Sequence, residues 1–184
     1  DRLMDVEALT NQNRVRYAEP ILLSALVDQQ LSKLKAHANQ QQVRLINQIP
    51  SAFLLRSDTL MVETLIDSLV SNAIKHTAVG GEVVIDAAYE SNEKVLISVA
   101  NTSHNLNKGH LAKIERALST QAAPTTEVPA ETNYPGLGSG RGAGLFLTKL
   151  LLQAHDGKLT HSITVDQVTL IAHLPVPKLI GVLA

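Results

Sequence analysis

Apolar residues recur along this chain at two spacings, one typical of helices and the other typical of strands. A spacing of three or four residues predicts helices over 21–42, 58–76, 111–118 and 142–157. Short β-rich runs bounded by turn residues predict strands over 15–20, 43–50, 52–57, 82–90, 94–101, 158–164 and 167–176. Because adjacent strands are mixed with helices, we predict an α+β fold, a two-layer sandwich of helices on a mixed β-sheet.

Individual residues indicate where several of these elements begin or end. Pro20 is predicted to end the first strand, since proline cannot donate to a β-ladder. Asp58 is predicted to cap the helix that follows it, and Gly157 to close the last helix. Between them, residues 119–141 are rich in proline, glycine, serine and threonine, which predicts a long loop.

The composition narrows the class of protein. A chain of 184 residues that is 45% hydrophobic and 18% charged fits one compact domain. A net charge of −1 with scattered lysines and arginines, and 3% aromatic residues, argue against nucleic acid as a partner. The absence of cysteine excludes disulfides and thiolate chemistry, and no apolar run is long enough to cross a membrane. The opening "DRLMDVEALT" looks like a cut inside a longer protein.

A polar arc follows one side of the predicted helix 58–76, beside its apolar stripe. Its members are Ser68, Asn72, Lys75 and His76. A polar arc at the edge of a buried stripe can line a cleft, where the Asn72 amide oxygen suits Mg²⁺ and Lys75 suits phosphate. The alternative interpretation is an ordinary solvated helix flank.

Three glycines mark the entry into the predicted helix 142–157. Gly140, Gly142 and Gly144 would let a phosphate approach unpaired amides at a helix N-terminus, where the helix dipole favours anions. The spacing fits neither a Walker A loop nor a dinucleotide fingerprint. A flexible glycine-rich hinge is the alternative here.

Two other kinds of chemistry are disfavoured. The seven histidines show no metal-binding spacing beside an acid, and "GLGSG" lacks the context of a nucleophile elbow. We therefore set aside a metal centre and a serine hydrolase.

Taken together, "SLVSNAIKHT" and, after a strand pair and a long loop, "GRGAGLFLTKLLLQAHDGKL" resemble the catalytic ATP-binding domain of sensor histidine kinases. That family shares its Bergerat-type fold with gyrase, Hsp90 and MutL. The resemblance covers 14–175 and implies that 107–141 form the ATP lid. It further implies that residues 1–13 end a dimerisation and phosphoacceptor helix and that 176–184 are a tail or linker.

The resemblance assigns roles to residues position by position. Asn72 matches the asparagine that binds Mg²⁺, Lys75 a lysine near the phosphates, and His76 a residue flanking the nucleotide. The glycines of the second glycine box match Gly140, Gly142 and Gly144, with Leu145 following as usual.

The chain also departs from the family pattern. Ser68 stands where the family has an earlier asparagine. The first glycine box aligns with "NTSHN", so that Asn101 replaces the aspartate that accepts a hydrogen bond from adenine, and Ser103 and Asn105 replace glycines. An asparagine can still accept through its amide oxygen.

The resemblance implies an ATP- and Mg²⁺-dependent kinase domain that delivers the γ-phosphate to a histidine on an adjacent hairpin outside these residues. The implied partners are that hairpin, in a homodimer, and a response regulator. The implied location is cytoplasmic, with no membrane contact by this domain, and a membrane-bound sensor upstream of it is common in the family. A degenerate module that senses nucleotide or binds a partner without phosphotransfer is the alternative. An ATPase that activates water with a pocket glutamate is disfavoured, because Ser68 stands at that position.

Overall fold

The computed structural model describes residues 18–103 and 143–176. Three helices lie in this part of the chain: α2 (Leu23–Gln40), α3 (Thr59–His76) and α5 (Ala143–Ala154). The strands are β1 (Glu19–Leu22), β2 (Arg44–Asn47), β3 (Leu54–Ser57), β4 (Glu82–Ser91), β5 (Lys94–Thr102), β6 (Lys158–Ile163) and β7 (Gln167–Pro175).

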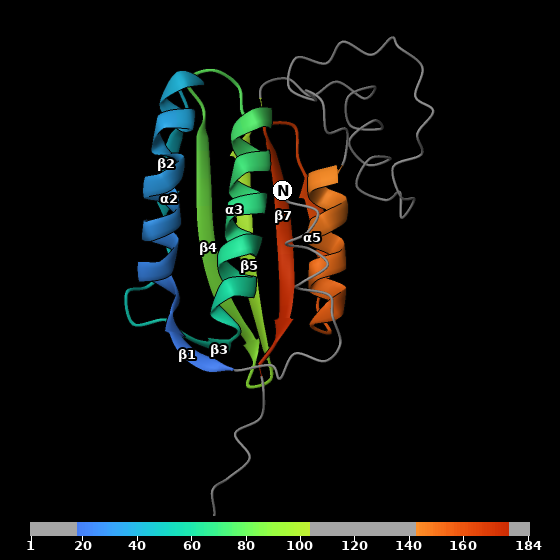
Figure 1. Cartoon of the computed structure of the whole chain (residues 1–184). Coiled ribbons are helices and arrows are strands. Elements are labelled where there is room, and N and C mark those ends of the chain that lie inside the picture. The colour runs from blue at the N-terminus through green and yellow to red at the C-terminus, as the bar shows by residue number, and fades with distance from the viewer. Residues whose placement is uncertain (1–17, 104–142, 177–184) are drawn as a thin grey trace, which may run out of the picture.

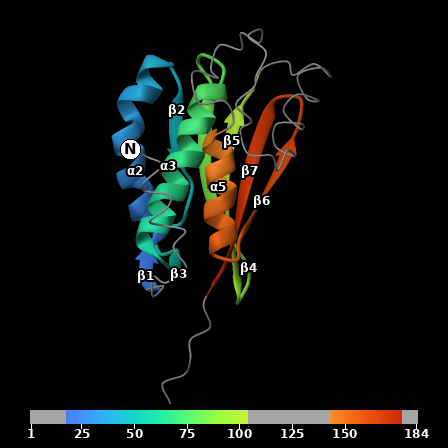
Figure 2. The ribbon, with the colours of Figure 1, turned by 45° about the vertical axis from the view of Figure 1, so that its right-hand side comes forward.

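A five-stranded mixed sheet forms one layer of the molecule, with strand order β2-β4-β5-β7-β6. β2 runs parallel to β4, and the other neighbours are antiparallel. The helices α2, α3 and α5 cover one face of this sheet, as the two views in Figures 1 and 2 show. The predicted two-layer α+β fold is confirmed.

The core lies between the helices and the sheet. Along β5, every second residue from Val95 to Asn101 is buried, because successive side chains of a strand point to opposite faces. From the helix layer, α3 contributes residues with no exposed surface, namely Val62, Leu65, Ile66, Leu69 and Ile74. The stripe predicted from helical spacing, which consists of Val62, Ile66, Leu69 and Ala73, is therefore buried.

A second, two-stranded sheet corrects the predicted beginning of the fold. β1 pairs antiparallel with β3, and Pro20 lies inside β1, opposite Arg56, rather than ending the strand. Proline is tolerated there because β1 is an edge strand, which needs ladder bonds on one side only. Since Leu22 belongs to β1, α2 begins at Leu23, two residues later than predicted.

Other predicted boundaries are confirmed. The carboxylate of Asp58 accepts a hydrogen bond from the Met61 amide at 2.9 Å, which caps α3. At the end of α5, the Gly157 amide donates to the Leu152 carbonyl at 2.7 Å. A Cβ at Gly157 would lie 2.5 Å from the His173 carbonyl oxygen, so a side chain does not fit there.

Several predictions fall outside the described residues. These are the helix 111–118, the loop 119–141 within the lid 107–141, the helix end at 1–13, and the tail beyond residue 176. Of the helices in 18–103 and 143–176, none combines the length and apolarity needed to span a bilayer.

Candidate nucleotide-binding site

The ends of three elements meet at one end of the sheet. α3 ends at His76 and β5 at Thr102, and the Ala78 amide donates to the Thr102 carbonyl at 3.3 Å. A Cβ at Gly81 would lie 2.7 Å from Thr77 Cγ2, so the turn after α3 packs closely on that helix end. Figure 1 shows that α5 also begins at this end of the molecule.

α5 therefore runs antiparallel to α3. Its last turn leads into Gly157, which packs on His173, and His173 pairs with Leu96 near the start of β5. The start of β5 is the end of the sheet opposite to Thr102. This arrangement places the first turn of α5 beside the last turns of α3 (Figure 2).

The polar arc on α3 lies partly against α5 and partly in solvent. The Ser68 and Thr148 hydroxyl oxygens lie 2.7 Å apart, which joins the arc to α5. Asn72 is half-buried one helical turn further on, and Lys75 and His76 are exposed. The arc is therefore not a uniformly solvated flank, since Ser68 is hydrogen-bonded to another helix.

His76 ends α3 in a distinct electrostatic setting. Surrounding protein atoms lower its pKa although the side chain reaches solvent, and the neighbouring Lys75 cation lowers it further. A pKa below the ordinary value of 6.5 keeps the imidazole neutral at pH 7. The positive charge at this helix end is therefore carried by Lys75.

Asn101 occupies a buried position under the helices at the end of β5. Its residue is 5% exposed, and it continues the helix-facing row of Val95, Ile97 and Val99. A primary amide in such a row costs free energy unless it is hydrogen-bonded, and it offers both an acceptor and donors. Close by, the Ser103 amide donates to the Asp166 carbonyl at 2.7 Å, which fixes the chain directly after β5.

The first turn of α5 contains two further predicted residues. Gly144 follows the first residue of the helix, and Leu145 is half-buried against the core. Backbone amides in a first helical turn lack intrahelical partners and favour an anion. Gly140, Gly142 and Asn105 lie outside the described residues, so the structure does not place them.

Sequence reasoning missed Thr148. This residue of α5 is 1% exposed, and its hydroxyl is hydrogen-bonded to the Ser68 hydroxyl of α3. The signal available was a single hydroxyl inside the apolar run "GLFLTKLLL". A polar group within such a run indicates a buried partner.

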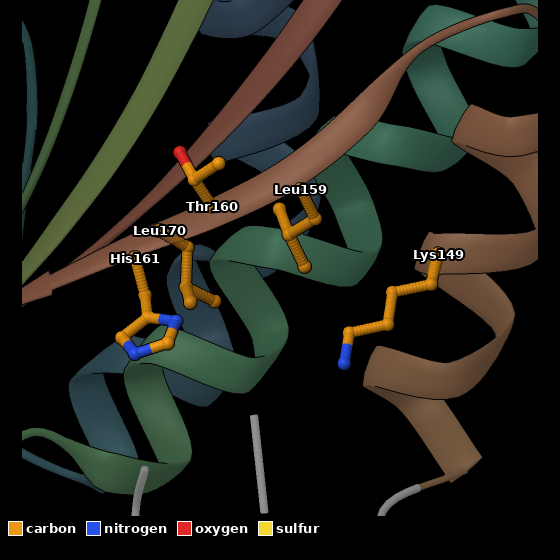
Figure 3. A pocket seen from close by; sticks show the side chains of 5 residues that line it. All are labelled: Lys149, Leu159, Thr160, His161 and Leu170. Carbon is orange, nitrogen blue, oxygen red and sulfur yellow. The ribbon is translucent and has the colours of Figure 1, made fainter. Parts of the chain in front are cut away.

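A small hollow lies elsewhere, between α5 and the hairpin of β6 and β7 (Figure 3). Its lining residues are Lys149, Leu159, Thr160, His161 and Leu170. None of the predicted site residues lines it, so this hollow is separate from the candidate site.

The polar side chains at the candidate site have the chemistry needed to bind a nucleotide. A buried amide at Asn101 suits a base, and the amide of Asn72 and the ammonium of Lys75 suit a metal-bound polyphosphate. The start of α5 adds a helix N-terminus beside them. Fold and site thus define a nucleotide-binding domain built from a helix layer on a mixed sheet.

The sequence comparison agrees with this class. The family model described as "Histidine kinase-, DNA gyrase B-, and HSP90-like ATPase" matches residues 57–178. This chain belongs to that family, and membership implies that it binds ATP.

Similar proteins are histidine kinases by name. The cell-division control histidine kinase PdhS of Brucella anthropi is 28% identical over 140 residues, which cover 74% of this chain and 13% of PdhS. The adaptive-response sensory kinase SasA of Synechococcus elongatus is 26% identical over 140 residues, which cover 76% of this chain and 33% of SasA. The match thus spans only a small part of either relative.

Solved structures show the same fold. The catalytic domain of histidine kinase ThkA superposes with a TM-score of 0.64 at 19% identity, covering 86% of this chain and 95% of that one. The Acinetobacter baumannii histidine kinase AdeS gives a TM-score of 0.67 at 14% identity, covering 96% and 76%.

Proposed function

We propose that this domain binds Mg-ATP between the last turns of α3 and the first turn of α5, and that it delivers the γ-phosphate to a histidine on an adjacent helical hairpin. The observation that carries the proposal is that α3, which holds Asn72 one turn before its end, and β5, which holds Asn101 as its second-last residue, end on the side of the sheet where α5 begins (Figure 1). Family membership and the names of the similar proteins support it.

Each group has a role that follows from its chemistry. The Asn101 amide oxygen accepts a hydrogen bond from the exocyclic amine of adenine, in place of a carboxylate. The Asn72 amide oxygen serves as a metal ligand, and Lys75 attracts the phosphates together with the helix end at Gly144. Mg²⁺, when bound, neutralises charge on the phosphates. His76 flanks the nucleotide as a neutral imidazole.

Phosphotransfer needs parts beyond the described residues. We propose that residues 1–13 end the phosphoacceptor hairpin, that 14–175 form the catalytic domain with 107–141 as its lid, and that 176–184 are a tail or linker. Gly140 and Gly142 would contribute to phosphate binding from the lid side. The whole protein would act as a homodimer, on the cytoplasmic side, with a response regulator as the next acceptor.

A second candidate function is nucleotide sensing without phosphotransfer. Two features favour it: the Ser68 hydroxyl lies against Thr148, and an amide at Asn101 stands where the family has an acid. At both positions, 68 and 101, the chain lacks the side chain that the family has in the pocket, although the fold is the same.

Label transfer separates the two candidates. The full natural protein, including its hairpin, is incubated with Mg²⁺ and ATP that carries a labelled γ-phosphate. A kinase gives acid-labile label on a histidine, and Asn72→Ala abolishes that label, whereas the control Ser98→Ala, on the opposite face of the sheet, keeps it. Saturable ATP binding with no label on protein would support the sensing module and contradict the kinase.

A further inference from the structure

The hydrogen bond between Ser68 and Thr148 joins two elements that are distant in sequence. The residues are 80 positions apart, their hydroxyl oxygens are separated by 2.7 Å, and either can be the donor. A 2.7 Å separation is a typical O–H···O hydrogen bond. This is a contact between side chains of α3 and α5, rather than a cap or a turn within one helix.

The bond lies at the edge of the core, between the buried Thr148 and the half-buried Ser68. Thr148 is 1% exposed, and Leu69 on α3 and Leu152 on α5 have no exposed surface. A hydrogen bond in a setting of low dielectric constant is stronger than one in water, and it has a fixed geometry. The bond can therefore hold the two helices at one separation and one register.

The position of the bond relates it to the candidate site. Because α3 and α5 are antiparallel, one helical turn from the bond leads to Asn72 on α3 and to Gly144 on α5. Four residues of helix span about 6 Å, so both lie about one turn away in the same direction. Among the hydrogen bonds described for 18–103 and 143–176, this is the one that joins α3 to α5. It lies about one helical turn from both Asn72 and the first turn of α5.

We propose that Ser68 and Thr148 are positioning residues: their hydrogen bond sets the distance between Asn72 and the first turn of α5, and so tunes the affinity for the phosphates of ATP. This inference rests on the proposed nucleotide site. It gives Ser68 a role through α5, in addition to its predicted place at the edge of the pocket. Ser68, which stands where the family has an asparagine, then has a hydrogen-bonding partner in Thr148 on the facing helix.

The test measures Mg-ATP affinity and hydrogen exchange of the α5 amides, on the full chain, for a small set of variants. Thr148→Val removes the hydroxyl at nearly constant volume, and Thr148→Ser keeps it. Thr64→Val is the matched control, because Thr64 is also on α3 but its hydroxyl donates to the Leu60 carbonyl of its own helix at 2.8 Å. Ser68→Ala and the double variant Ser68→Ala with Thr148→Val complete a cycle.

The proposal predicts that Thr148→Val and Ser68→Ala each weaken ATP binding by about three- to ten-fold, as the loss of one hydrogen bond implies. The double variant should bind ATP less weakly than the product of the two single losses predicts, because both substitutions break the same bond. Thr148→Ser and Thr64→Val should stay within about two-fold of the natural chain. Without nucleotide, the α5 amides should exchange faster in Thr148→Val than in Thr64→Val.

Two results would overturn the inference. One is ATP affinity in Thr148→Val equal to that in Thr64→Val, and the other is equal α5 exchange in those two variants. Failure of the proposed function is distinct from both, because the natural chain itself would then not bind ATP.

Discussion

At the scale of single residues, Asn101 differs from its neighbours in the helix-facing row of β5, where Val95, Ile97 and Val99 precede it. We expect Asn101→Leu, which keeps the volume but removes the amide, to weaken ATP binding by about five- to ten-fold, the effect of losing one hydrogen bond to a buried group. Affinity for inorganic triphosphate should be unchanged, because the phosphates bind elsewhere. Titration of both ligands checks this, with Ser98→Ala on the opposite face of β5 as the control. Equal losses for both ligands would contradict the assignment of Asn101 to the base.

The residue scale also shows what the sequence could predict of the site. The polar arc on α3 followed from helical spacing, because positions four residues apart share a face. That Ser68 meets Thr148 did not follow, since 80 residues separate them and the contact depends on how α5 packs on α3. The burial of Asn101 could be inferred only once the strand register was known. The roles of the site residues stay predictions.

At the scale of elements, the ends of α3 and α5 depend on specific groups. Asp58→Ala removes the carboxylate that accepts from the Met61 amide. We expect a loss of about 1 kcal/mol in the free energy of unfolding, the usual effect of deleting an N-cap. Chemical denaturation measures it, and Asp58→Asn, which keeps an acceptor oxygen, should lose clearly less. An equal loss in both variants would mean that the cap bond is not the cause.

Two glycines in different turns, Gly157 after α5 and Gly80 between α3 and β4, should differ in their tolerance of a side chain. A Cβ at Gly157 would meet the His173 carbonyl oxygen at 2.5 Å and the Leu152 carbonyl oxygen at 3.2 Å. Gly80 has a φ of +80° and no atom within 4 Å of a Cβ. We expect Gly80→Ala to cost about 1 kcal/mol through backbone strain, and Gly157→Ala to cost about 2–4 kcal/mol because strand β7 must move. Denaturation midpoints that rank the two variants in the reverse order would contradict this packing.

Element boundaries were the part of the fold that local reasoning predicted least well. Pro20 was predicted to end the first strand because proline has no amide hydrogen to donate. It lies inside β1 instead, because an edge strand tolerates proline. The strands β2 and β3, adjacent in sequence, belong to different sheets, which no local pattern indicates. The strands β4 and β5, in contrast, were predicted over 82–90 and 94–101, and they pair antiparallel across a short connection.

At the scale of the whole molecule, the dependence of stability on pH follows from His173. Burial chiefly lowers its pKa, the Lys158 and Lys94 cations lower it further, and Glu90 opposes them. In the described part of the chain, its buried Nδ1 has no hydrogen-bond partner, and its Nε2 lies 2.8 Å from the Thr160 hydroxyl. Protonation is therefore less favourable in the folded state than in the unfolded one.

The sign of the effect follows from linkage. A pKa lowered on folding contributes stability that is present above the ordinary value of 6.5 and is lost as the pH falls below it. His76, whose pKa is also lowered, acts in the same direction. We expect the free energy of unfolding to decline from about pH 6.5 to about pH 5, before most carboxylates titrate. His173→Gln should make this decline shallower, and an unchanged slope in denaturation series would contradict the role of His173.

The proposed function depends on Mg-ATP binding through Asn72, at the end of the sheet where α3, β5 and α5 meet. Calorimetric titration of the chain with ATP, in the presence and absence of Mg²⁺, tests it most directly, with Asn72→Ala and the control Thr64→Val measured in parallel. We expect saturable binding that Mg²⁺ strengthens and that Thr64→Val retains. Asn72→Ala should weaken it by at least about ten-fold, as expected for the loss of a ligand to a charged group. No saturable binding at millimolar ATP, or binding that Asn72→Ala leaves unchanged, would contradict it.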